Sequence, residues 1–163
     1  MVQLKRIVLI TTAIVSLIAL MVPSVFACGK VTGGGHGKIG ELARTPAGSF
    51  GFNAMWGEKT GLKGELNYVD HITGMHVHIH EITYLNVWED LPGNKPWPLM
   101  KAEFEGPCTI DGVEGFFAYV YVEDNGEPGT SDKFYIALST GYEGGSMDDP
   151  ILVGNIQIHK PMP

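Results

Sequence analysis

Basic residues are scarce in this 163-residue chain, which holds eleven lysines and arginines against eighteen acidic residues. Two of the eleven, Lys5 and Arg6, lie in the first 27 residues, so the remainder carries a formal charge of −9. An acidic surface repels the phosphates of nucleic acids and of anionic lipid headgroups. We therefore expect no nucleic-acid partner for this protein.

The sequence patterns of several large enzyme classes are also missing. The chain has no Gly-x-Ser-x-Gly elbow, no phosphate-binding loop and no His-Glu-x-x-His motif. Carboxylates are too numerous in so acidic a chain for any one pair to indicate glycoside hydrolysis. The sequence therefore predicts that the protein is not an enzyme.

The first 27 residues have the pattern of a secretory signal peptide. The basic residues at positions 5 and 6 precede an uncharged apolar run at 7–22, and Pro23 separates this run from the small-residue cleavage region that ends at Ala27. The apolar run has sixteen residues, fewer than the roughly 20 that span a bilayer. We expect cleavage after Ala27, which leaves a single secreted or cell-surface domain at 28–163.

The only two cysteines are Cys28 and Cys108. Outside the cell such a pair is more often bridged than free, so a disulfide between them is expected. Residues 25–28 also resemble a lipobox, the signal for attaching a lipid to a cysteine. In that alternative Cys28 would anchor the protein to a membrane, and Cys108 would be a free buried thiol.

Glycine, in contrast, is abundant: 22 glycines recur along the chain and leave no stretch after the leader with a convincing helical period. Apolar and polar residues alternate between them, for example at 49–56, 101–105 and 133–138. The run at 113–122 is apolar on both faces, as in a central strand. The sequence predicts about eight antiparallel strands in an all-β, jelly-roll-like sandwich. The predicted core contains Phe50, Phe52, Leu66, Phe104, Phe117, Phe134, Ile136 and Ile156.

An ordered set of short motifs runs through the chain after the leader. These are residues 31–35 (VTGGG), 48–54 (GSFGFNA), 64–68 (GELNY), 102–106 (AEFEG), 112–116 (GVEGF) and 132–136 (DKFYI). Together they resemble the post-COAP family of small secreted β-sandwich modules, and the resemblance covers nearly all of 28–163. It implies an extracellular β-sandwich and no catalytic residues.

Three histidines alternate along one predicted strand, at His76, His78 and His80. Side chains two residues apart in a strand lie on one face, so neighbouring imidazoles can share a zinc or copper ion. The pattern also resembles the copper-ligand strand of copper–zinc superoxide dismutases, but the chain after His80 has one further histidine and no arginine to complete that site. A metal-binding protein or metalloenzyme is therefore the alternative function. We favour a solvated strand face.

Residues 123–132 (EDNGEPGTSD) form a second polar cluster. Asp124, Asn125, Glu127 and Asp132 supply the carboxylate and amide oxygens that Ca²⁺ prefers. The spacing is not that of an EF-hand, and Asn-Gly and Pro-Gly also form turns without an ion. Both interpretations stay open, a calcium site and an ordinary acidic turn.

Taken together, these features predict a structural, adhesive or binding module at the cell surface or in the extracellular matrix. The glycine-rich segment at 33–35 could pass as a strand to a neighbouring copy, so a homo-oligomer or filament is one expected form. A surface protein or a glycan is the other expected partner, because Trp88 and Trp97 can stack on a sugar ring.

Overall fold

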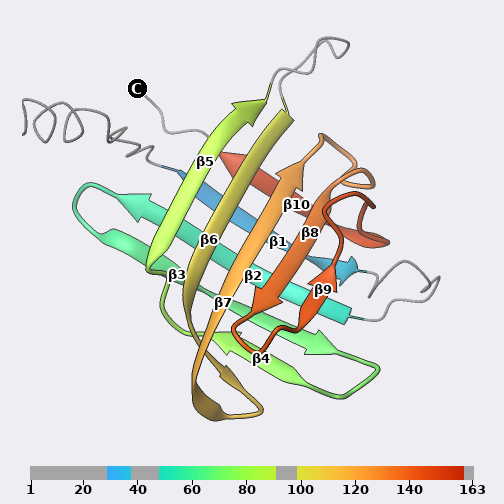
Figure 1. Ribbon diagram of the computed structural model, residues 1–163. Coiled ribbons are helices and arrows are strands. Elements are labelled where there is room, and N and C mark those ends of the chain that lie inside the picture. Colours follow the sequence, from blue (N-terminus) through green and yellow to red (C-terminus); the bar gives the residue numbers. More distant parts are fainter. Residues whose placement is uncertain (1–28, 38–47, 91–98, 160–163) are drawn as a thin grey trace, which may run out of the picture.

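The computed structural model describes residues 29–37, 48–90 and 99–159, which form strands and turns without a helix (Figure 1). The predicted leader, Cys28 and Trp97 lie outside these ranges. No helix within them has the length and apolar character needed to cross a membrane. The strands are β1 (Lys30–Gly37), β2 (Gly48–Gly57), β3 (Gly61–Asp70), β4 (His76–Ile79), β5 (Tyr84–Asp90), β6 (Leu99–Ile110), β7 (Val113–Asp124), β8 (Lys133–Leu138), β9 (Glu143–Gly145) and β10 (Val153–His159).

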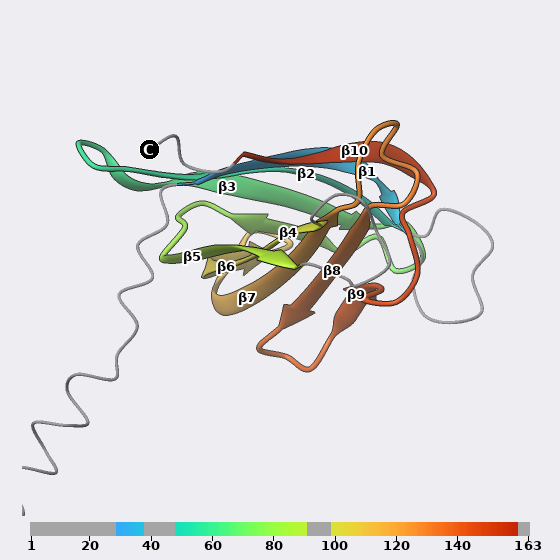
Figure 2. The same cartoon turned by 90° about the horizontal axis from the view of Figure 1, so that it is seen from above.

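All strand pairs are antiparallel, and they form one continuous sheet in the order β10-β1-β2-β3-β4-β6-β7-β8-β9. β5 and β4 pair with the same edge of β6. β5 pairs with the first half of β6, and β4 pairs with its last residues. The sheet curls, so that β10, β1, β2 and β3 form one layer and β5 to β9 form a second layer facing it (Figure 2).

The predicted all-β antiparallel class is confirmed, but the predicted arrangement of the strands is not. A jelly roll has two sheets and long crossing connections, whereas here β1 to β9 follow one another nearly in sequence order within one sheet. A sheet that folds over itself buries one face of every strand, as a sandwich does. The alternation of apolar residues therefore cannot distinguish the two arrangements.

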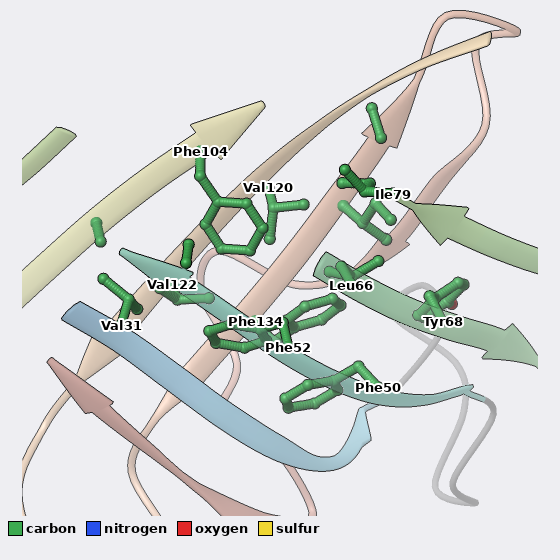
Figure 3. Packing of buried hydrophobic residues seen from close by; sticks show 14 of the residues in the cluster. Val31, Phe50, Phe52, Leu66, Tyr68, Ile79, Phe104, Val120, Val122 and Phe134 are labelled. Atoms are coloured by element: carbon green, nitrogen blue, oxygen red, sulfur yellow. The ribbon is translucent and has the colours of Figure 1, made fainter. Parts of the chain in front are cut away.

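The core fills the space between the two layers (Figure 3). Phe50 of β2 stacks on Phe134 of β8 with ring centroids 3.9 Å apart, and Phe52 lies 5.2 Å from Phe104 of β6. Seven of the eight predicted core residues are at most 6 % exposed. The phenylalanines thus join the two layers.

Phe117 is the predicted core residue that the structure contradicts, because its side chain is 42 % exposed. In β7 the buried apolar residues are Ala118, Val120 and Val122, so Phe117 belongs to the opposite, outer series of this strand. The sequence at 115–122 carries no charged residue in either series, which hides the phase of the alternation.

The glycine-rich segment forms strand β1 within the protein's single sheet. There β1 pairs with β2 on one side and with β10 on the other. A Cβ at Gly33 would lie 2.7 Å from the ring of Phe52, and a Cβ at Gly35 would lie 2.3 Å from the carbonyl oxygen of Val153. Glycine is therefore required for β1 to fit between its neighbours. The segment is already paired within the chain, so passing it to another copy would require β1 to leave this sheet.

Candidate functional site

Four of the six tyrosines lie on the outer surface of β5, β6, β7 and β8, the side that faces the viewer in Figure 1. They are joined there by Trp88, whose ring lies 6.2 Å from that of Tyr121. Tyr84 is 41 % exposed, and the other four rings are half-buried. We name this surface the tyrosine face and define it by Tyr84, Trp88, Tyr119, Tyr121 and Tyr135.

Strand register brings the five rings together. Tyr121 of β7 lies opposite Glu103 of β6 and Tyr135 of β8, and Tyr119 lies opposite Glu105. Opposite residues in antiparallel strands have Cβ atoms about 4.5–5.5 Å apart. Rings from β5, β7 and β8 therefore form one surface with carboxylates of β6 and β7 between them.

Glu103 is the hydrogen-bond acceptor at the centre of the tyrosine face. Its Oε1 accepts from the hydroxyl of Tyr84 at 3.0 Å and from the amide of Asn86 at 3.3 Å. Its Oε2 accepts from the hydroxyl of Tyr119 at 3.1 Å. Hydrogen-bond donors of the surrounding side chains thus stabilise the carboxylate of Glu103, and the carboxylate in turn fixes the rings of Tyr84 and Tyr119.

Glu123 has the same role at one end of the face. It accepts from the hydroxyl of Tyr121, and it lies 3.2 Å from the ammonium of Lys133 and 3.6 Å from that of Lys101. Burial acts to raise the pKa of Glu123, but hydrogen bonds from Tyr121 and Asn125 and the charge of Lys133 lower it overall. Glu123 is therefore an ionised carboxylate held in an ion-pair network.

The tyrosine hydroxyls stay protonated. Burial, followed by the hydrogen bond to Glu103, raises the pKa of Tyr119 to about 12. Burial and the hydrogen bond to Glu123 likewise raise the pKa of Tyr121. The rings are therefore uncharged at physiological pH.

A surface pocket of about 300 Å³ lies at the Glu123 end of the tyrosine face. Its described lining combines polar and apolar side chains: Leu99, Glu123, Asn125, Ser131, Lys133 and Pro150. Glu123 of the pocket lining accepts the hydrogen bond from Tyr121 of the face, so a ligand on the rings can extend into the pocket.

Of the four residues predicted to bind calcium, Asp124 ends β7 and the other three lie in the loop that follows it, but most of their carboxylate oxygens accept hydrogen bonds from the protein. The oxygens of the fully buried Asp132 accept from the backbone N–H of Asn125 at 2.9 Å and of Ile156 at 2.7 Å. Those of Asp124 accept from Gly126 at 3.1 Å and from Ile158 at 3.0 Å.

Glu127 adds a third connection between this loop and β10. Its Oε1 accepts from the amides of Asn155 at 3.0 Å and Gln157 at 3.2 Å. Three carboxylates therefore fasten the loop to the edge of β10 that does not pair with β1. We name this set of bonds, made by Asp124, Glu127 and Asp132, the β10 latch.

His76 and His78 lie on one face of β4, with Val77 and Ile79 buried on the other face, whereas His80 follows the end of the strand. The Nδ1 atom of His78 is hydrogen-bonded to Asn67 at 2.9 Å, and the rings of His78 and His80 are 6.3 Å apart. Among the residues that the structure describes, no three His, Cys, Asp or Glu side chains form a group that could hold a metal ion.

Cys108 is a free, buried thiol, so the structure shows no disulfide at this residue. Cys28 lies outside the described residues, so the predicted bond between the two cysteines has no support here and stays a prediction.

No family model, curated protein or solved structure matches the chain. The resemblance to the post-COAP family therefore stays a prediction from the motifs. Sequence reasoning named Trp88 but missed the tyrosines around it. The alternation Tyr119, Tyr121, Glu123 was the available signal, because a polar tip on each of these side chains is typical of the outer series of a strand.

Proposed function

We propose that this protein is a non-enzymatic binding module, secreted or held at the cell surface, that binds an extracellular polymer through the tyrosine face. The extracellular location rests on the signal-peptide pattern of residues 1–27. The binding role rests on the five aromatic rings that gather on one accessible side of the sheet.

The placement of these rings is the observation that carries the proposal. A sheet with one solvated side normally has polar residues there, and the interior is already filled by Phe50, Phe52, Phe104 and Phe134. Half-exposed Tyr and Trp side chains are typical of binding surfaces, because each offers a large apolar area with a polar tip. Glu103 and Glu123 fix three of the rings, so little side-chain freedom is lost on binding.

The other functions predicted from the sequence have less support. A metal-binding protein or metalloenzyme would need further ligands near His76, His78 and His80, and no such group occurs in the described part of the chain. A calcium ion at the loop between β7 and β8 would have to displace hydrogen bonds of the β10 latch. Self-assembly into a homo-oligomer or filament stays a prediction.

Binding of the secreted protein to immobilised, purified extracellular polymers tests the proposal. The panel contains neutral polysaccharides, anionic polysaccharides and matrix proteins. We expect at least one polymer to bind, and we expect Tyr121→Ala to weaken that binding by about tenfold or more, as for a central aromatic contact. Asn53→Ala, on the outer side of β2, is the matched control and should leave binding unchanged. Equal affinity of the two variants would contradict the proposal.

A further inference from the structure

The chemistry of the tyrosine face points to one class of ligand. On the basis of the function proposed above, we infer that the ligand is a neutral polysaccharide. One chain lies across β5 to β8 on the aromatic rings and places a sugar unit in the pocket beside Lys133.

The rings and their polar neighbours match the two kinds of surface on a sugar. The flat faces of a pyranose carry C–H groups, which pack on the electron-rich faces of aromatic rings. Its rim carries hydroxyls, which both donate and accept hydrogen bonds. Tyr119, Tyr121 and Tyr135 supply adjacent rings on β7 and β8, while Glu103 and Lys101 lie beside them on β6.

The charge of the face excludes the main alternatives. Its carboxylates, Glu103, Glu105 and Glu123, outnumber the ammonium groups of Lys101 and Lys133, so an anionic polysaccharide would be repelled. A second copy of this acidic chain, with a formal charge of −9 over residues 28–163, would be repelled as well. Since Glu103 and Glu123 already have donors within the protein, a cationic ligand is not needed to neutralise them.

The pocket adds a site for one sugar unit of the polysaccharide. Its volume of about 300 Å³ is at the small end of ligand-binding sites. Lys133 offers a donor and Ser131 offers a hydroxyl at its lining, and the neighbouring rings of Tyr121 and Trp88 are within reach of the same chain. A pocket of this size and lining, next to aromatic rings, fits one sugar ring of a polysaccharide that lies on those aromatic rings.

Calorimetric titration with soluble hexasaccharides tests the inference. Neutral glucose, mannose and N-acetylglucosamine hexamers are compared with a hexamer of galacturonic acid. We expect one neutral hexamer to bind and the anionic one not to bind. Tyr121→Ala and Tyr135→Ala should each weaken binding tenfold or more, whereas Asn53→Ala, on the outer side of β2, should change it less than twofold. Thermal melts of each variant establish that it is folded.

A second variant tests the pocket separately. Ser131→Phe places a ring at the pocket lining without removing the backbone carbonyl that accepts from Asn125. We expect it to weaken binding of the neutral hexamer at least fivefold, and an unchanged affinity would overturn the assignment of the pocket. If only an anionic polymer or a matrix protein binds, and Tyr121→Ala weakens it, the polysaccharide inference is wrong and the proposed function stands. If Tyr121→Ala weakens no interaction, both are wrong.

Discussion

The two outer surfaces of the curled sheet differ in one respect above all. The outer side of β5 to β8 carries the tyrosine face, while the outer side of β10, β1, β2 and β3 carries small or polar residues such as Thr32, Gly51, Asn53 and Asn67. None of the described outward positions of those four strands is Tyr, Trp or Phe. A Cβ at Gly51 would meet no atom within 4 Å, so packing does not impose the small residue.

Both layers have the same inner pattern, in which phenylalanines alternate with outward residues and meet in the core. Since the inner sides are alike, folding alone does not explain why only one outer side is aromatic. Solvent-facing substitutions on a sheet usually change stability little. We therefore propose that the aromatic side serves binding, and the following predictions separate the residues that stabilise the fold from those that form the tyrosine face.

The largest effect on stability is expected at the contact that both layers share. Phe134→Ala removes the ring that stacks on Phe50 and should lower the free energy of unfolding by about 3–5 kcal/mol. Phe117→Ala, on the outer side of β7, should cost about 1 kcal/mol or less, because this side chain is substantially exposed. Urea unfolding of the two variants measures both values. Equal losses would mean that the core does not join the layers as described.

A smaller loss is expected when the β10 latch is opened. Asp132→Ala leaves the N–H groups of Asn125 and Ile156 without their acceptor, which should cost about 2–5 kcal/mol for two such groups. The exposed Asp148 is the matched control, and Asp148→Ala should be within about 0.5 kcal/mol of wild type. The same urea experiment applies. A loss at Asp132 no larger than at Asp148 would contradict the structural role of the latch.

The latch also predicts a dependence of stability on pH. Burial, together with the charges of Asp124 and Glu127, raises the pKa of Asp132 to about 6 from the ordinary 3.8. A carboxyl with a raised folded-state pKa binds its proton more tightly when folded. Its contribution to stability is therefore complete below about pH 4 and falls by about 3 kcal/mol as the pH rises to about 6.

Asp132→Asn isolates this contribution, because asparagine does not titrate. Asp70 and Glu123 have lowered pKa values, so their contributions to the stability of the protein decrease as the pH falls, opposite to that of Asp132. These two contributions are present in both the wild type and the variant. We expect the wild-type free energy of unfolding to fall relative to that of the variant between pH 4 and pH 6. Parallel curves for the two proteins over this range would contradict the raised pKa.

The smallest effect is expected from calcium. A preformed site would stabilise the fold by about 2.7 kcal/mol at a free ion concentration one hundred times its dissociation constant. The oxygens of Asp124 and Asp132 already accept backbone hydrogen bonds. We therefore expect the same melting temperature with millimolar calcium as with a chelator. A clear rise that Asp124→Ala abolishes would restore the calcium site predicted from the sequence.

The sequence predicted the fold class and most of the core because burial on one side of a strand leaves a period of two, as at 49–56 and 133–138. Local sequence also matches local structure at Asp111 and Gly112, an Asp-Gly pair in which both residues have positive φ, as a tight hairpin turn requires. Which strands pair depends on contacts distant in sequence. The single curled sheet, and β1 within it, could therefore not be derived from local patterns.

The candidate site was less predictable than the fold. Asp124, Asn125, Glu127 and Asp132 were grouped from their proximity in the sequence, but the sequence does not show that β10 supplies donors for the carboxylate oxygens. The tyrosine face is made of residues from β5, β7 and β8, and only the register between strands brings them together.

The central claim, that the tyrosine face is the binding surface, is tested most directly by mapping ligand contacts with nuclear magnetic resonance. Backbone amide shifts of isotope-labelled protein are recorded during titration with the neutral hexasaccharide that binds. We predict that the largest shifts occur at Tyr119, Tyr121 and Tyr135 and that residues such as Thr32 and Asn53 do not shift. Shifts centred on β10, β1, β2 and β3, or on the histidines of β4, would contradict the claim.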